Sequence, residues 1–514
     1  MTPGSPLPRA LYRADEVRAL DACAIGKFGI PGMTLMERAG QAAFGIIQRR
    51  WPRAQRIVVF CGGGNNGGDG YVVASLARRA GKDVTVVHVG ARDALRGDAR
   101  TAMEQAVAAR VPMVDALDPA VQPDRDMLGG PVDLVVDALL GTGLRTPVRA
   151  DYLGAIETLN ASGAPVLAID LPSGLCADSG IQFGSAVRAD ATVTFIGLKR
   201  GLFTGRGPAL CGDVYFDDLR VPPAVQEQVA AQAERLDASL VDELLAPRAR
   251  DAHKGRFGHV LVIGGDHGFA GAALLAAEAA ARSGAGLVSV ATRPEHVTAF
   301  VTRRPELMVR AVTQPAALEP LLARATVAVV GPGLGTEAWG RSLLACALQS
   351  RLPLVLDADA LNLIAAGAPD AFAARRRDPQ WVLTPHPGEA GRLLGVDSAA
   401  IQADRFRRVR ELQSRFGGTV LLKGAGTLID SGDGRPVSVA AVGNPGMASG
   451  GMGDVLSGVI GALLAQGLSP ADAARLGAVV HGAAADRCAA RHGERGLLAG
   501  DLFEPLRELL NGRR

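Results

Sequence analysis

The feature that most limits how this chain can fold is the alternation of two periodicities along nearly its whole length. Short β-branched runs alternate with stretches of helical periodicity. This alternation is typical of a parallel sheet covered by helices, because each pair of parallel strands needs a long crossover connection. After helices expected at 15–24 and 35–50, the first series of expected strands covers 56–60, 84–89, 132–140, 165–170 and 191–197. A second series covers 259–265, 287–292, 327–333, 353–359, 381–385 and 419–424.

The two series are separated by residues 221–250, which are rich in proline and charge and have no strand pattern. We therefore place a domain boundary near residue 235, giving domains 1–235 and 236–514. A length of 514 residues suits two large α/β domains. No internal repeat relates the two series, so we expect two different folds.

Charge and apolar patterning exclude several classes of protein. The 55 Lys and Arg against 52 Asp and Glu give a formal charge of only +3, too little to attract nucleic acid or an anionic membrane. No apolar run approaches the ~18 residues of a membrane span, and the first residues lack an apolar export segment. Six scattered cysteines with no C-x-x-C pair predict a reducing compartment, the cytoplasm.

A glycine-rich loop follows the first strand of the first series. In CGGGNNGGDG, Gly62, Gly64 and Gly67 satisfy G-x-G-x-x-G ahead of a helix, a placement that suits an anion at the helix N-terminus. The alternative is a tight strand-to-helix turn, but almost every residue of the loop is Gly or Asn, which favours ligand binding. An NAD site also expects an acid at the end of the second strand, where this chain has His88. The dehydrogenase interpretation is therefore disfavoured.

Two further strand ends of the first domain carry acidic residues. Asp137 is followed by a GTG loop, and Asp170 lies in IDLPSG just before Ser173. Either aspartate alone could be a cap or turn former. Because ligands bind at the carboxyl ends of strands in open α/β sheets, three such loops in one domain predict a shared site.

Together NNGGDG, DALLGTGL and IDLPSG resemble the N-terminal domain of NAD(P)H-hydrate epimerases over about residues 10–220. The resemblance implies a Rossmann-like three-layer α/β/α fold. It also implies a potassium ion held by Asn66, Asp137 and Ser173, and oxygen donors suit such a hard cation. The substrate contacts it implies are Asn65, Asn66, Gly67, Gly68, Asp69, Gly141, Thr142, Gly143, Leu144, Arg145, Thr146, Pro147 and Asp170.

The epimerase chemistry itself selects Asp170. Inverting C6 of a hydrated nicotinamide ring requires proton transfers as the hydroxyl leaves and returns, and a placed carboxylate can supply them. Some relatives have a lysine where this chain has Arg145. Because an arginine stays charged, we interpret Arg145 as a phosphate clamp.

The strongest signal of the second half is NPGMASGGMGDVLSG, a glycine-rich loop that runs into an apolar helix. Backbone N–H groups at the start of that helix would form an anion hole for a phosphoryl group in transfer. Asp454 beside it could take a proton from an attacking hydroxyl. The structural alternative is an aspartate that caps the helix.

The G-x-G-D pattern resembles the ribokinase-like fold, and HKGRFGHVLVIGGD, GPGLG, LDADALN, TPHPGE and LKGAGT narrow the resemblance to NAD(P)H-hydrate dehydratases over about residues 240–510. His386 replaces the Asn that sugar kinases of this fold usually have. Alone, His386 or Lys423 could be an ordinary structural or solvated residue. The resemblance implies substrate contacts at Gly333, His386 and Asp454, an adenine nucleotide bound by Lys423, Gly424, Ala425, Gly426, Thr427 and Gly453, and Mg²⁺ with its phosphates.

Both halves thus imply repair of one metabolite, hydrated NADH or NADPH (NADHX or NADPHX). The first domain would interconvert the R and S forms, and the second would dehydrate the S form with ADP, giving AMP and phosphate. The implied partners are NADHX, NADPHX and ADP, within a homo-oligomer. Two alternatives remain: a vitamin-precursor kinase with a regulatory N-terminal domain, and a binding or scaffold module without enzymatic activity.

Overall fold

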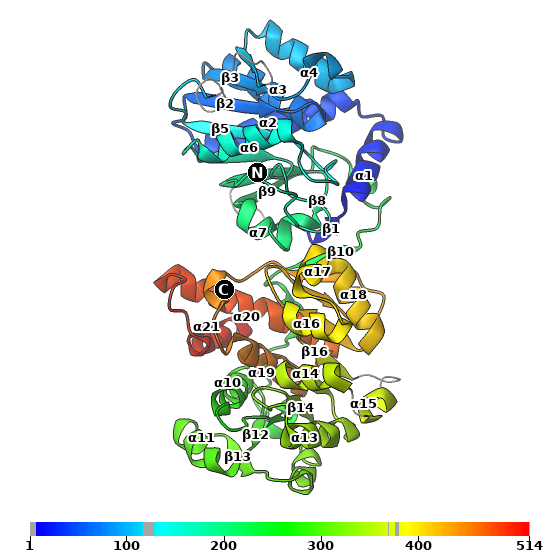
Figure 1. Ribbon diagram of the computed structural model, residues 1–514, viewed down its shortest axis with the longest axis vertical. Helices are drawn as coiled ribbons and strands as arrows, with labels where there is room; N and C mark the ends of the chain where they lie inside the picture. The colour runs from blue at the N-terminus through cyan, green and yellow to red at the C-terminus, as the bar shows by residue number, and fades with distance from the viewer. Residues whose placement is uncertain (1–6, 117–127, 368–369, 376–379, 513–514) are drawn as a thin grey trace. The chain divides into compact units, whose positions relative to one another are not determined.

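The computed structural model describes residues 7–116, 128–367, 370–375 and 380–512. The chain divides into two compact units, Met1–Glu234 and Arg235–Arg514 (Figure 1). Both are α/β units built on largely parallel sheets, as the alternating pattern predicts.

The first unit contains a parallel sheet of strand order β4-β3-β2-β5-β6-β7-β9. All five strands expected in the first series are present, whereas β4 and β9 were not expected. The order reverses between β2 and β5, so the crevice at their carboxyl ends is the natural ligand position. The strands are β2 (Arg56–Cys61), β3 (Asp83–His88), β4 (Met113–Asp115), β5 (Leu134–Ala138), β6 (Val166–Ile169), β7 (Ala191–Phe195) and β9 (Asp213–Asp217).

Helices cover both faces of this sheet. Because side chains alternate along a strand, Ile57 and Val59 face the core under α2, α3 and α4, while Val58 and Phe60 face the core under α6. The result is the predicted three-layer arrangement. The helices of the unit are α1 (Ala14–Gly26), α2 (Gly32–Arg50), α3 (Asn65–Arg79), α4 (Gly97–Ala108), α6 (Ala150–Ala161), α7 (Gly207–Leu210) and α8 (Pro223–Gln226).

A small group of strands lies outside this order. Strand β1 (Ala10–Tyr12) pairs in parallel with β8 (Leu198–Lys199) and antiparallel with β10 (Ala233–Leu236). The expectation that 221–250 contains no strand is therefore wrong. The sequence AERL has no apolar run because two half-buried charged residues stand between buried Ala233 and Leu236, and its pairing depends on distant β1.

The second unit has the strand order β13-β12-β11-β14-β15-β16-β17-β18-β19, parallel as far as β17 and antiparallel beyond it. All six expected strands are present. The order again reverses, here between β11 and β14. The strands are β11 (His259–Ile263), β12 (Leu287–Thr292), β13 (Met308–Ala311), β14 (Val327–Val330), β15 (Leu354–Leu356), β16 (Trp381–Leu383), β17 (Thr419–Leu422), β18 (Thr427–Asp430) and β19 (Val437–Ala440).

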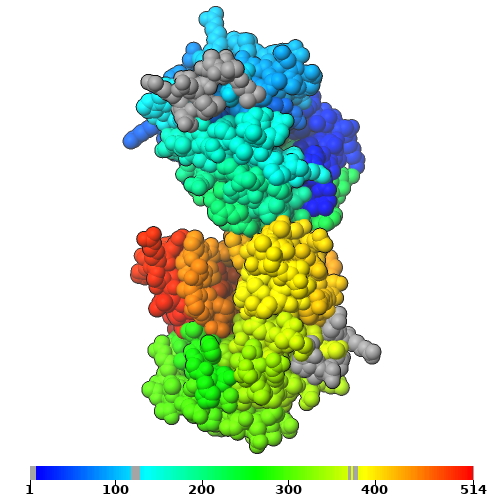
Figure 2. Space-filling model, viewed as in Figure 1, coloured from blue at the N-terminus to red at the C-terminus, as the bar shows by residue number. Residues whose placement is uncertain are grey.

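Helices α10, α19 and α20 form the largest core of the second unit, built mainly from Ala, Val and Leu. Helices α16 to α18 lie together on its surface, as the yellow atoms of Figure 2 show. Among the residues described, no helix combines the length and the apolarity needed to cross a bilayer. The helices are α9 (Leu240–Leu244), α10 (Ala270–Arg282), α11 (Val297–Arg303), α12 (Glu319–Leu322), α13 (Ala338–Gln349), α14 (Ala358–Gly367), α15 (Asp370–Arg375), α16 (Pro387–Leu394), α17 (Ser398–Ala403), α18 (Arg405–Phe416), α19 (Met452–Ala465), α20 (Pro470–His492) and α21 (Phe503–Leu510).

Candidate functional site

A pocket of about 290 Å³ opens where the strand order of the first unit reverses. It collects residues from α1, α2 and the start of α3 together with residues at or beyond the ends of β5, β6 and β7. Seven of the predicted substrate contacts line it: Asn65, Asn66, Asp69, Gly141, Thr142, Gly143 and Asp170. The three strand-end loops therefore do form one site.

The glycine loop is built for close backbone approach. A Cβ at Gly62 would lie 1.9 Å from the Leu139 carbonyl oxygen, and one at Gly67 would lie 2.0 Å from the Gly62 carbonyl oxygen. Helix α3 begins directly after Gly64 without a side-chain cap. Its first N–H groups are thus available to an anion, as the motif predicts.

Asp170 stands at the end of β6 in a left-handed backbone conformation, with φ of 68°. One carboxylate oxygen accepts a short hydrogen bond from the ammonium group of Lys199. That ammonium group also donates to the Thr194 hydroxyl at 3.0 Å and the Phe195 carbonyl at 3.1 Å, and the Lys199 side chain is only 1% exposed. All three lysine donors are used, so Lys199 fixes Asp170 against the pocket wall.

Two further carboxylates face the same pocket. Burial, with the nearby charges of Asp170 and Asp21, raises the pKa of Asp69 well above its usual range. Burial also raises the pKa of Asp21 to about 6, against the lowering effect of Lys199. The pocket thus combines one buried cation with carboxylates that favour a bound proton, the elements of acid–base chemistry.

The residues expected to hold potassium are Asn66, which lines this pocket, and Asp137 and Ser173, which are buried. Asp137 is fully buried, accepts hydrogen bonds from the Ser173 amide at 2.8 Å and hydroxyl at 2.6 Å, and has its pKa raised to about 6 by burial. Both polar side-chain atoms of Asn66 are buried without a hydrogen-bond partner in the described part of the chain. Unpartnered oxygen next to a buried carboxylate fits a hard monovalent cation.

The remaining predicted contacts lie outside the pocket lining. Gly67 and Gly68 are buried within α3, where a Cβ at Gly68 would lie 2.5 Å from the Met36 methyl carbon. Leu144, Arg145, Thr146 and Pro147 continue the loop beyond Gly143. His88 is fully buried and pairs with the Tyr71 hydroxyl at 2.6 Å, so the second strand ends without a ribose-binding acid.

In the second unit, Asp454 lies in the first turn of α19. The helix N-cap is Gly451, with φ of 89°, and no side chain caps the helix, so the alternative that Asp454 is an N-cap is wrong. Burial, with the charges of Asp357, Asp359 and Glu389, raises the pKa of Asp454 to about 7, although Lys423 lowers it. A carboxylate that titrates near neutral pH suits a general base.

Lys423 joins the carboxylates next to this helix. Its ammonium group bonds Asp357 at 2.8 Å and lies 3.9 Å from Glu389, while the second Asp357 oxygen accepts from the Ser457 hydroxyl at 2.7 Å. A Cβ at Gly453 would lie 3.1 Å from the Lys423 ammonium nitrogen. Lys423, predicted from one motif, therefore lies beside Gly453 and Asp454, predicted from another, at the start of α19.

His386 and Gly333 hold two loops of the second site. His386 is the N-cap of α16: its Nδ1 accepts from the Gly388 amide at 2.9 Å, and Glu389 closes a capping box by accepting from the His386 amide at 2.8 Å. Its imidazole is half-exposed, and its Nε2 lies 3.5 Å from a Glu389 carboxylate oxygen. Gly333 has φ of 57°, and a Cβ there would lie 2.6 Å from the Phe269 carbonyl oxygen, so glycine is required.

The predicted nucleotide loop, residues 423–427, is held from inside by Arg405. This fully buried guanidinium donates to the carbonyl oxygens of Leu422, Lys423 and Gly426 at 3.2 to 3.3 Å. Gly424 and Ala425 remain exposed, while Thr427 donates its hydroxyl back to the Gly424 carbonyl oxygen at 3.2 Å. The loop is thus fixed from below, with its outer surface open to a ligand.

Comparison with known proteins places both halves in described families. Residues 32–201 match the family described as YjeF-related protein N-terminus, and residues 260–508 match NAD(P)H-hydrate dehydratase. The chain is 50% identical to the bifunctional NAD(P)H-hydrate repair enzyme Nnr of Coxiella burnetii over 98% of this chain and 99% of that protein. The enzyme of the same name from Escherichia coli is 45% identical over 98% and 95%. The chain belongs to the bifunctional NAD(P)H-hydrate repair enzymes.

Among solved structures, an ADP/ATP-dependent NAD(P)H-hydrate dehydratase of Bacillus subtilis, co-crystallised with ATP and Mg²⁺, is 28% identical. It covers 54% of this chain and 97% of its own length, with a TM-score of 0.47. The expected family and the α/β fold class, with two units built on largely parallel sheets, are confirmed for this member of the bifunctional NAD(P)H-hydrate repair enzymes.

Several site residues of this repair enzyme were missed at the level of sequence. Lys199 and Asp21 belong to the first pocket, and Asp357, Glu389 and Arg405 belong to the second site. Lys199 had a usable signal, because a lysine within the apolar stretch FIGLKRGLF is unusual. Arg405 lies in a helix rich in arginine, where nothing distinguishes the buried one.

Proposed function

We propose that the chain repairs hydrated nicotinamide cofactors at two separate sites, one in residues 1–235 and one in residues 236–514. The first interconverts the R and S forms of NADHX and NADPHX, and the second dehydrates the S form. The observation that carries the proposal is that one chain holds both sites, each with a glycine-rich helix start and a lysine–aspartate pair. Neither a vitamin-precursor kinase nor a scaffold would need the first pocket's acid–base cluster.

In the first site, Asp170 is the acid/base group. It receives or returns a proton as the C6 hydroxyl leaves and adds again from the other ring face, while Lys199 keeps its carboxylate in place. The loop that includes Arg145 binds the phosphates of the dinucleotide. Asn66, Asp137 and Ser173 would hold potassium, whose charge would favour the ionised form of Asp137 beneath the loop.

In the second site, Asp454 accepts the proton of the C6 hydroxyl, whose oxygen attacks the β-phosphorus of ADP and releases AMP. The C6–O bond of the phosphate ester then breaks, and loss of a C5 proton restores the ring double bond. The N–H groups at the start of α19, which no side chain caps, would stabilise the charge that the transferred phosphoryl group gains. Lys423 to Thr427 and Gly453 bind the nucleotide, while Gly333 and His386 contact the substrate.

Mg²⁺ accompanies the nucleotide phosphates. Within the described ranges no group of three or more His, Cys, Asp or Glu side chains could hold a metal ion. Both Asp357 oxygens are already used by Lys423 and Ser457. This supports a magnesium ion bound mainly through phosphate and water, as Mg²⁺ prefers.

The cytoplasm is the proposed compartment, supported by six free cysteines, which persist in a reducing environment. The homo-oligomer implied by the resemblance stays a prediction, which the mass of the protein in solution tests.

The decisive experiment incubates the protein with separated R and S NADHX, with and without ADP. We expect recovery of NADH absorbance from S-NADHX only with ADP, and interconversion of the two forms without any nucleotide. Stable phosphorylated product from a vitamin precursor, with no NADH recovered, would instead establish the kinase alternative. Failure of both reactions would favour the scaffold alternative.

A further inference from the structure

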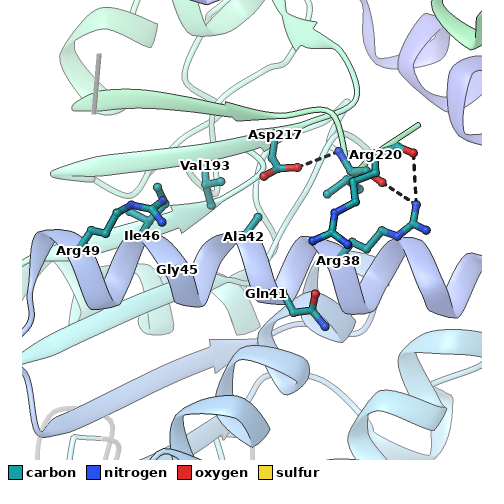
Figure 3. A pocket seen from close by; sticks show the side chains of 10 residues that line it. Arg38, Gln41, Ala42, Gly45, Ile46, Arg49, Val193, Asp217 and Arg220 are labelled. Atoms are coloured by element: carbon teal, nitrogen blue, oxygen red, sulfur yellow. Dashed lines mark hydrogen bonds between the residues drawn. The ribbon is translucent and has the colours of Figure 1, made fainter. Parts of the chain in front are cut away.

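The first unit contains a second pocket, of about 200 Å³, that the proposed epimerase chemistry does not use. It lies between α2 and the ends of β7 and β9, and Figure 3 shows its lining. Leu219 lines both this pocket and the substrate pocket, so the two are neighbours. Three of its lining residues are arginines: Arg38, Arg49 and Arg220.

One face of α2 forms the floor of this arginine pocket. Arg38, Gly45 and Arg49 recur at helical spacing, which places them in one row about 16 Å long at 1.5 Å per residue. A Cβ at Gly45 would lie 3.2 Å from an Arg49 guanidinium nitrogen. The missing side chain thus leaves room for Arg49 to fold along the groove.

The wall opposite is a turn in an uncommon conformation. Leu219 and Arg220 both have left-handed backbones, with φ of 52° and 53°, which is costly for residues with side chains. Asp217 and Asp218 stabilise the turn by accepting from the Leu219 amide at 2.9 Å and the Arg220 amide at 2.8 Å. The Arg38 guanidinium donates to the Leu219 carbonyl oxygen at 2.8 Å, which brings Arg38 and Arg220 to one end of the pocket.

The charge of this lining is unbalanced. Three guanidinium groups face a single carboxylate, that of Asp217. Neither the Arg49 nor the Arg220 side chain makes a hydrogen bond or ion pair with another residue in the ranges the structure covers. Concave, cationic surfaces with free planar donors recognise phosphate.

We propose that the arginine pocket binds a small phosphate ester with free hydroxyl groups, the chemistry of a ribose phosphate. Arg38 and Arg220 take the phosphate, and the free Asp217 oxygen accepts from a hydroxyl, as carboxylates do with ribose in dinucleotide sites. Arg49 lines the end of the pocket opposite Arg38 and Arg220. The volume lies below the ~300 Å³ of drug-sized sites, which suits a molecule of this size.

The test is equilibrium dialysis of the full chain with ³²P-labelled ribose 5-phosphate and, separately, inorganic phosphate. Arg49→Gln and Arg220→Gln remove one charge each and keep most of the side chain. Arg53→Gln is the matched control, because Arg53 is exposed in the same unit and lies outside the pocket. Arg49→Gln should epimerise NADHX at the wild-type rate, which shows that its fold is intact.

We expect the wild type and Arg53→Gln to bind one more equivalent of ribose 5-phosphate than Arg220→Gln. Arg49→Gln should bind that additional equivalent with an affinity at least tenfold lower than the wild type. Inorganic phosphate should bind there more weakly than the ester. Equal stoichiometry in all four proteins would overturn the proposal. So would a fall in solution mass on removing Arg49 or Arg220, because the pocket would then be a contact between copies of the chain.

Discussion

The two sites contain the same pair of groups, a lysine bonded to an aspartate, but the aspartate has a different position in each site. In the first unit Lys199 bonds Asp170, the residue expected to move the proton. In the second, Lys423 bonds Asp357, while Asp454 makes no ion pair with any residue that the structure describes and has its pKa raised to about 7. The same pair therefore fixes the acid/base group in one site and leaves it free to titrate in the other.

The backbone explains this difference. Asp170 directly follows a strand and is turned by its left-handed conformation, so it lies against Lys199, which follows the next strand along the sheet. Asp454 instead lies in the first turn of α19, near the helix N–H groups and Lys423. The Lys423 ammonium group, however, already donates a hydrogen bond to Asp357. A general base acts best with a pKa near the working pH, which the second arrangement provides.

The largest effect should come from Asp454→Asn. An amide cannot accept the hydroxyl proton, so the dehydration rate should fall by about 10² to 10⁴. Epimerisation in the other unit should be unchanged. The measurement is NADH recovery from pure S-NADHX with ADP, with adenine nucleotide binding followed in parallel.

Stability provides the control for this variant. Because Asp454 caps nothing and its charge is unfavourable when buried, Asp454→Asn should melt no lower than the wild type. A variant that stays folded, binds nucleotide and keeps its dehydration rate would exclude Asp454 as the base.

A smaller loss, about 10² in epimerisation, is expected for Asp170→Asn, with dehydration of S-NADHX intact.

Lys199→Met tests the comparison itself. If the lysine only fixes Asp170, this variant should lower kcat for epimerisation with little change in KM. Thr194→Val is the milder companion variant, since it removes a contact of 3.4 Å to the same carboxylate and a Lys199 hydrogen bond of 3.0 Å but keeps the lysine charge. A full rate in Lys199→Met would show that the two lysine–aspartate pairs are not equivalent.

The sequence was sufficient for elements and loops whose signals are local. The periodicities predicted five strands of the first sheet and six of the second, and the glycine patterns predicted the two helix starts at Asn65 and Met452. What it did not yield depends on contacts between distant residues. Three such contacts join segments that show no pattern alone. They are the hydrogen bond from Lys199 to Asp170, the hydrogen bonds from Arg405 to the 423–427 loop, and the pairing of β1 with β10.

The smallest effect expected is a pH dependence confined to the second site. The active form of Asp454 is the carboxylate, and with a pKa of about 7 its ionised fraction rises about tenfold between pH 6 and 8. The kcat/KM for dehydration should rise by about the same factor. The stability of the fold changes in the opposite direction. The pKa of Asp454 in the folded state lies above its ordinary value of 3.8, so between pH 3.8 and 7 the native state binds a proton that the unfolded state has lost. The free energy of unfolding therefore decreases as pH rises through 7. Asp454→Asn lacks this loss, so its Tm advantage over the wild type should be larger at pH 8 than at pH 5. A flat rate profile together with a constant Tm difference would show that Asp454 titrates normally, and the contrast between the two sites would then be one of position alone.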